Sequence, residues 1–73
     1  MNIKYGDIEE AFVESIKKGD SKKVEEIYSC SDNKYILINM VKRKSLIDNL
    51  IDIAKNFVSL GHKKSLVNIA TKY

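Results

Sequence analysis

Apolar side chains recur at three- and four-residue spacing along most of this sequence, and this spacing is the feature that most limits its fold. Such a period gives an α-helix one apolar face, whereas a half-buried strand alternates at every second residue. One face of the first such stretch carries Ile8, Ala11, Phe12, Ser15 and Ile16. Asp7 followed by Glu10 has the arrangement of a capping box, and Gly19 suits the left-handed residue that follows a helix. The sequence therefore predicts a helix from Asp7 to Gly19.

Two further helices are indicated in the same way. Asp20 and Ser21 can each cap a second helix, which ends in the polar segment 29–33. A short last helix contains the apolar residues of segment 66–70 and follows the sequence HKKS. Ser65 is the expected cap of this last helix.

The best-defined helix begins at Ser45, because Ser45 with Asp48 repeats the capping-box arrangement. The apolar spacing then continues for about 16 residues until Gly61, which is the expected end. Its apolar arc is wider than the ~100° stripe of an ordinary surface helix. We therefore expect it to be the central helix, contacted from more than one side.

Residues 34–41, with the sequence KYILINMV, form an apolar run whose conformation the periodicity does not assign. The run is short enough for a strand, but no glycine or proline stops it from continuing as a helix into the basic KRK segment. We favour a helix and keep a strand as the alternative, because the two conformations point to different functions.

At 73 residues the chain has room for one core, so we expect a single domain that spans residues 1–73. Its 44% hydrophobic and 32% charged residues are typical of a globular protein. No proline interrupts the predicted helices. The expected fold class is all-α, a compact bundle of four or five short helices. A chain of this size buries only about 60% of its unfolded surface, and self-association is a common way to bury more.

Residue types that carry catalysis or bind metals are scarce. Cys30 is the only cysteine and His62 the only histidine, which leaves no internal disulfide and no metal-ligand spacing. The three glycines are scattered, so there is no phosphate-binding loop. We expect no enzyme activity, no cofactor, no metal and no small-molecule substrate. Cys30 is expected to be a half-buried residue near a helix end.

The N-terminal sequence MNIKYGDIEE lacks the basic and apolar regions of a secretory signal. The longest apolar run is far shorter than the ~20 residues of a membrane-spanning helix. A single cysteine also suits a reducing compartment. We therefore expect a cytoplasmic protein with no membrane association.

Charge is distributed unevenly along the chain. Residues 1–33 carry five lysines and eight acids, a net charge of −3, whereas residues 34–73 carry eight basic residues and two acids, a net charge of +6. The basic half could bind an anion, or the two halves could attract one another within the fold or across a dimer. The candidate nucleic-acid contacts are Lys42, Arg43, Lys44, Lys63, Lys64 and Ser65.

Residues 34–73 resemble a ribbon-helix-helix DNA-binding domain, with YILIN as the strand, SLIDNLIDIAKNF as the first helix and GHKKSLVNIATKY as the turn and second helix. The resemblance implies a dimer whose paired strands read the major groove. The groove face would consist of Tyr35, Leu37 and Asn39. The phosphate contacts would be Lys63, Lys64 and Ser65.

The function that we expect first is that of a small non-enzymatic protein–protein interaction module, an adaptor or inhibitor. It would bind a protein partner, or a second copy of itself in a homodimer, through an apolar helix surface. The wide apolar arc of the predicted central helix favours this function. The alternative is nucleic-acid binding, for which one arginine, Arg43, among thirteen basic residues is a poor supply of base-reading side chains. A strand at residues 34–41 would favour the alternative, and a helix the interaction module.

Overall fold

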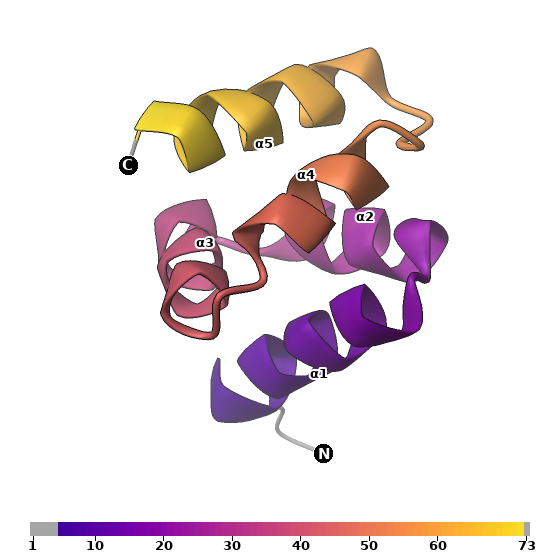
Figure 1. Ribbon diagram of the computed structural model, residues 1–73. Coiled ribbons are helices and arrows are strands. Elements are labelled where there is room, and N and C mark those ends of the chain that lie inside the picture. The colour runs from indigo at the N-terminus through magenta and orange to yellow at the C-terminus, as the bar shows by residue number, and fades with distance from the viewer. Residues whose placement is uncertain (1–4, 73) are drawn as a thin grey trace.

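The computed structural model describes residues 5–72, which form five helices and no strand (Figure 1). The helices are α1 (Tyr5–Lys18), α2 (Ser21–Cys30), α3 (Lys34–Arg43), α4 (Ile47–Ala54) and α5 (Leu60–Lys72). The radius of gyration is 11.0 Å, close to the ~11 Å expected for a folded chain of this length. The predicted all-α bundle is confirmed.

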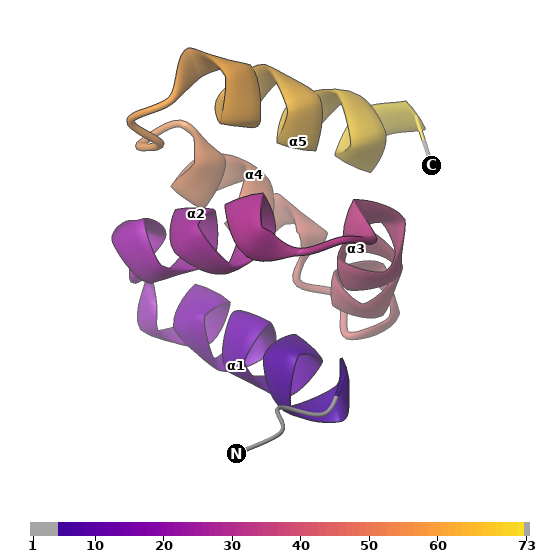
Figure 2. The same ribbon diagram turned by 180° about the vertical axis from the view of Figure 1, so that it is seen from behind.

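The helices are arranged around α4. α1 and α2 pair as a hairpin, α3 stands across their ends, and α5 runs along the edge of the molecule opposite α1 (Figures 1 and 2). α4 packs against each of the other four helices. The prediction of a central helix in this part of the chain, contacted from more than one side, is therefore confirmed.

One apolar core joins all five helices. Each helix contributes at least one large side chain that is at most 2% exposed: Phe12, Tyr28, Leu37, Leu50 and Leu66. Burying a side chain of this size contributes roughly 1.5–3 kcal/mol. The core therefore holds every helix in place, and the outward faces are what remains for function.

The turn between α1 and α2 depends on two neighbouring residues. Gly19 has a φ of +72° and donates its N–H to the carbonyl of Ile16 at 3.0 Å. Asp20 donates its N–H to the carbonyl of Ser15 at 3.0 Å, which completes a Schellman motif. The side chain of Asp20 then accepts the N–H of Lys23 at 3.2 Å and caps α2. The predicted roles of Gly19 and Asp20 are both confirmed.

Residues 34–43 are helical, which confirms the favoured interpretation of the KYILINMV run. The side chain of Asn33 caps α3 by accepting the N–H of Ile36 at 3.2 Å. The core-facing residues of α3 have helical spacing and are Leu37, Ile38 and Val41. The strand of a ribbon-helix-helix fold is therefore absent, and this structural alternative for residues 34–73 is wrong.

The segment around α4 differs most from the prediction. Ser45 does not cap a helix; its φ is +59°, and it ends α3 in the way that Gly19 ends α1. α4 follows without a side-chain cap and has only 8 residues. The chain turns at residues 55–56, yet Phe57 beyond the turn still packs into the core. The apolar spacing therefore continues past the end of the helix, which is why it predicts a longer one.

Three further assignments are corrected. α1 includes Tyr5, so Asp7 lies inside the helix and is not its N-cap. Gly61 does not end a helix, because it is the second residue of α5. Ser65 lies within α5 and therefore does not cap it.

Candidate protein-binding surfaces

Among the side chains that the structure describes within residues 5–72, there is no group of three or more His, Cys, Asp or Glu residues that could hold a metal ion. No helix in the same range is long and apolar enough to cross a membrane. Cys30 is exposed at the end of α2, rather than half-buried as predicted. The features with a distinctive chemistry are a polar cluster at the start of α5 and surface hollows of opposite charge.

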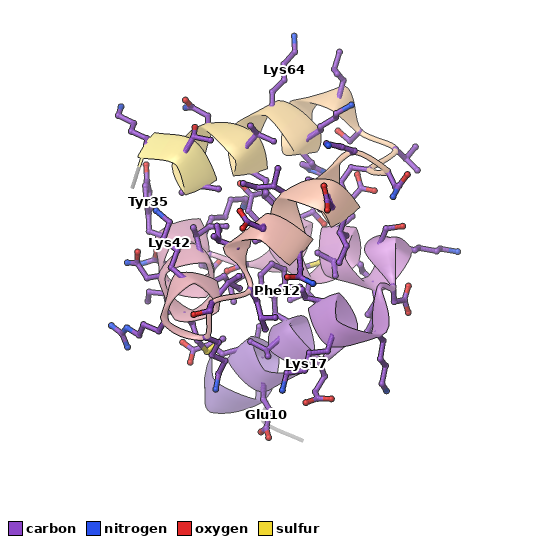
Figure 3. All side chains as sticks on the ribbon, in the orientation of Figure 1. Glu10, Phe12, Lys17, Tyr35, Lys42 and Lys64 are labelled. Atoms are coloured by element: carbon purple, nitrogen blue, oxygen red, sulfur yellow. The ribbon has the colours of Figure 1, made fainter. Side chains whose placement is uncertain are left out.

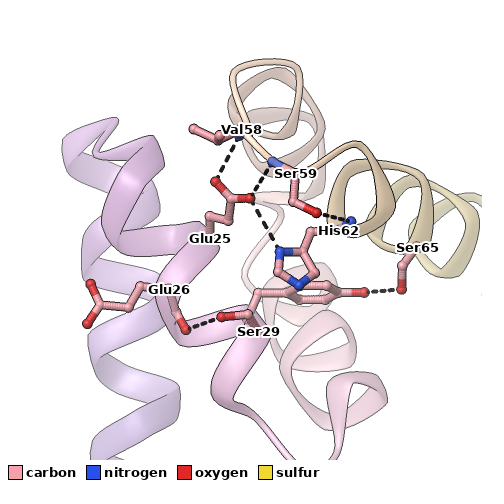
Figure 4. A network of polar contacts seen from close by, with 8 residues as sticks. Glu25, Glu26, Ser29, Val58, Ser59, His62 and Ser65 are labelled. Atoms are coloured by element: carbon pink, nitrogen blue, oxygen red, sulfur yellow. Dashed lines mark hydrogen bonds and ion pairs between the residues drawn. The ribbon is translucent and has the colours of Figure 1, made fainter.

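Glu25 of α2 holds the start of α5 in place (Figure 4). Its carboxylate accepts the backbone N–H groups of Val58 and Ser59, both at 2.9 Å. The same carboxylate lies 3.3 Å from Nδ1 of His62. The Oγ of Ser59 accepts the N–H of His62 at 3.3 Å and caps α5. Backbone N–H groups that a helix start leaves open are therefore satisfied here by the protein's own side chains.

This arrangement stabilises the charged form of Glu25. The N–H groups of Ser59 and Val58 lower the pKa of Glu25 below its usual 4.5, while burial acts in the opposite direction and His62 lowers it further. A carboxylate that accepts hydrogen bonds from N–H groups keeps its negative charge more readily. The start of α5 therefore holds a fixed negative charge at the place where a helix terminus would otherwise attract a phosphate.

Ser65 has a partner inside the fold. Its Oγ lies 2.8 Å from the phenolic oxygen of Tyr28, a residue that is fully buried. Burial raises the pKa of Tyr28, and the hydrogen bond to Ser65 partly offsets this rise. The Tyr28 ring also packs against the rings of Phe57 and His62, with centroids 6.4 Å away in each case. Ser65 is therefore a link between α5 and α2.

The predicted basic residues lie on, or directly next to, two different helices, and Figure 3 shows Lys42 on α3 well apart from Lys64 on α5. Lys63 and Lys64 lie on α5. The other cluster lies at the end of α3 and consists of Lys42, Arg43 and Lys44. Within it, Lys44 lines a hollow together with acids of α1. These acids are Glu9, Glu10 and Glu14. The two basic clusters therefore lie on different parts of the surface, and one of them lies beside negative charge.

The central helix does not provide the exposed apolar surface that the sequence predicts. Leu50, Ile53 and Ala54 of α4 are buried, because the other four helices surround it. Large apolar side chains are exposed elsewhere, on α3, on α5 and in the loop before α5.

One face of α5 combines apolar and basic side chains around a shallow hollow of about 440 Å³. This α5 face consists of Leu60, Lys63, Lys64, Val67, Asn68 and Thr71. Leu60 is 60% exposed. A single exposed apolar side chain is ordinary in a soluble protein. Here, however, Leu60 shares a concave surface with Val67 and two lysines, which is a combination suited to binding.

A second apolar surface lies where α1, α2 and α3 meet. Two adjoining hollows of about 80 and 200 Å³ share Ile8, Cys30 and Ser31, and we call the pair the acidic groove. Its apolar lining comes from Ile8, Ile27, Ile36 and Leu37. Its acids are Glu9, Glu26 and Asp32. The acidic groove therefore resembles the α5 face in its apolar content but has the opposite charge.

Sequence reasoning misses both the role of Glu25 and the acidic groove. Glu25 accepts N–H groups 33 and 34 residues further along the chain, so no local pattern reveals it. The acidic groove is assembled from three helices. Only the start of α5 has a local signal, because Ser59 precedes the apolar Leu60 in the way that an N-cap precedes a helix.

No protein family, curated protein or solved structure matches this chain. Its surface chemistry is therefore what bears on its function.

Proposed function

We propose that this chain is a small protein–protein interaction module, an adaptor or inhibitor, and that the α5 face is its docking surface. The partner surface would be acidic and would carry a large apolar side chain. The observation that carries the proposal is the exposed Leu60, which lies beside Lys63 and Lys64 in one concave surface. For such a module we expect a cytoplasmic location and no enzyme activity of its own.

The α5 face has an apolar and an electrostatic contribution to binding. Full burial of a leucine side chain contributes roughly 1.5–3 kcal/mol, and 60% of Leu60 is left for a partner to cover. Lys63 and Lys64 would attract an acidic partner and select against a basic one. Glu25 and Tyr28 hold α5 on α2, so a partner would not have to order this helix on binding.

Nucleic-acid binding stays a prediction and has less support. Glu25 places a negative charge at the start of α5, close to the residues expected to hold phosphate. Lys44 lies beside the acids of α1. A fluorescent DNA duplex at low salt tests the alternative, because phosphate binding would weaken steeply as salt is added.

A displayed peptide library, selected against the immobilised full chain, tests the proposal. We expect the selected peptides to combine acids with large apolar residues. Their affinity is expected to fall at least about tenfold in the Leu60→Asp variant and in the Lys63→Glu/Lys64→Glu variant. The Ile36→Asp variant is the matched control, because Ile36 is 45% exposed but lies away from the α5 face. Selection of no peptide, or peptides that bind Leu60→Asp unchanged, would refute the proposed docking surface.

A further inference from the structure

We propose that a second copy of this chain is a partner of the module, and that the α5 face of one copy docks into the acidic groove of the next. This inference rests on the proposed function, because it names the occupant of the same docking surface. Three features of the two surfaces support it: their charges, their apolar content and their positions on the molecule.

The charges of the two surfaces are opposite. The acidic groove carries Glu9, Glu26 and Asp32, and the α5 face carries Lys63 and Lys64. Among the side chains that the structure describes, the ion pairs are Lys17 with Glu14, Lys55 with Asp52 and His62 with Glu25. None of them uses a charge of either surface. Among the described residues, therefore, the charged side chains of the two surfaces form no ion pair, and they can pair with those of a second copy.

The apolar contents also match. The larger hollow of the acidic groove has a volume of about 200 Å³, and its lining combines Ile8, Ile27 and Cys30 with the polar Glu26 and Ser31. A protein cavity of about 150 Å³ already accommodates a benzene molecule, so the isobutyl group of Leu60 fits this hollow. Leu60 protrudes from the α5 face with 60% of its surface exposed. Docking would cover Leu60 and the apolar lining of the groove at the same time.

The positions of the two surfaces on the molecule determine whether association stops at a dimer or continues. α5 runs along one edge of the molecule, and α1, which contributes Ile8 and Glu9 to the acidic groove, runs along the opposite edge (Figures 1 and 2). A contact between two different surfaces is heterologous, so each added copy still presents one open face and one open groove. Association would therefore continue beyond a dimer unless a ring closes. Contacts between small surfaces are typical of weak and transient complexes, so we expect association only at high concentration.

Sedimentation velocity tests the inference on the full chain at concentrations from about 20 µM to about 1 mM. We expect the wild-type chain to form a growing series of oligomers. Leu60→Asp and Ile36→Lys are each expected to be monomeric, because the first removes the docking leucine and the second places a positive charge in the groove opposite Lys63 and Lys64. An equimolar mixture of these two variants is expected to form a 1:1 dimer that does not grow, because the intact face of one fits the intact groove of the other. The Lys23→Glu variant, changed outside both surfaces, serves as the control and should associate like the wild type.

Charge reversal gives a second test with the same readout. Lys64→Glu and Glu26→Lys are each expected to weaken association at least about tenfold. Mixing them should restore growing oligomers, because the reversed face then meets the reversed groove. Far-UV circular dichroism shows whether each variant is folded. If one variant of a pair is unfolded, the other pair of variants provides the test.

A wild-type chain that remains monomeric at about 1 mM would overturn the inference, and so would a mixture of Leu60→Asp and Ile36→Lys that stays monomeric. If selected acidic peptides nevertheless bind the α5 face of a monomeric chain, the proposed function stands and only the self-association is wrong. If neither the peptides nor a second copy bind, both are wrong.

Discussion

At the scale of single residues, two positions have a left-handed backbone and end helices in the same way. Gly19 and Ser45 have φ values of +72° and +59°, and each closes the preceding helix through a pair of backbone hydrogen bonds. Glycine adopts this conformation freely, whereas a residue with a Cβ is strained there by about 1–2 kcal/mol. The sequence predicts the first position because it is glycine. The sequence does not predict the second position, Ser45, because a serine before an apolar stretch is more typical of an N-cap.

Substitutions at these two positions should change stability in opposite directions. Gly19→Ala is expected to lower the free energy of unfolding by about 1 kcal/mol, because a Cβ there meets no atom within 4 Å and only the backbone is strained. Ser45→Gly is expected to raise it by about 0.5–1 kcal/mol, since the relief of strain exceeds the added entropy of the unfolded chain. Urea unfolding followed by circular dichroism measures both. A loss of stability in Ser45→Gly would mean that the serine side chain contributes more than the strain costs.

The hydrogen bond between Tyr28 and Ser65 predicts unequal effects for its two ends. Ser65→Ala leaves the buried Tyr28 hydroxyl without its partner, and we expect a loss of about 1–3 kcal/mol in the free energy of unfolding. Tyr28→Phe removes the buried hydroxyl itself, while the half-buried Ser65 can turn to water, so a loss of about 0.5–1.5 kcal/mol is expected. The same urea experiment compares them. Equal losses would indicate that water reaches the Tyr28 hydroxyl once Ser65 is removed.

At the scale of helices, the contact of Glu25 with the start of α5 makes the stability of the fold depend on pH. The folded-state pKa of Glu25 is lowered by the N–H groups of Ser59 and Val58, so the unfolded chain binds a proton more readily than the folded one. This stabilisation is therefore present above pH about 4.5 and is lost as the pH falls through the folded-state pKa. We expect Glu25→Gln to be less stable than the wild type at pH about 7, and the difference to shrink as the pH falls below about 4.5.

Urea unfolding at a series of pH values measures this difference. Glu26→Gln is the control, because the Glu26 carboxylate is exposed and makes none of these hydrogen bonds. The control should follow the wild-type profile. If the free energy of unfolding of Glu25→Gln differs from that of the wild type by the same amount at every pH, the negative charge of Glu25 does not contribute to this contact.

The helices themselves follow from the sequence to different degrees. α2 and α3 are close to their predicted ranges, because Asp20 provides a local cap and the apolar face of α3 keeps helical spacing. α4 is shorter than predicted because apolar spacing reports burial and not backbone conformation: Phe57 is buried although it follows the turn. The start of α5 depends on Glu25, which lies on another helix. The surfaces are the least predictable part, since the acidic groove exists only once three helices have packed together.

At the scale of the whole molecule, the uneven charge of the sequence becomes a separation of charge in space. α1, α2 and the loop after α2 carry the acids of the groove, and α5 carries Lys63 and Lys64. α5 and α1 lie at opposite edges of the molecule. The sequence reveals the imbalance but not its geometry. The sequence does not determine whether its acidic and basic halves attract one another within one molecule or between two copies. In the proposed arrangement, both kinds of attraction occur. Lys44 lies beside the acids of α1 in the same molecule, whereas the lysines of α5 are left to meet the groove of a second copy.

A contact held partly by these charges should weaken as salt is added. The Debye length falls from about 10 Å at 0.1 M salt to about 3 Å at 1 M, which screens the attraction of Lys63 and Lys64 for the groove. Apolar burial alone would not be weakened by salt. We therefore expect the wild-type oligomers seen in sedimentation to shrink over this range, and a Lys63→Gln/Lys64→Gln variant to form weaker oligomers whose size changes less with salt. If salt enlarges the wild-type oligomers instead, the copies are held together by apolar surface, and the lysines of α5 have another partner.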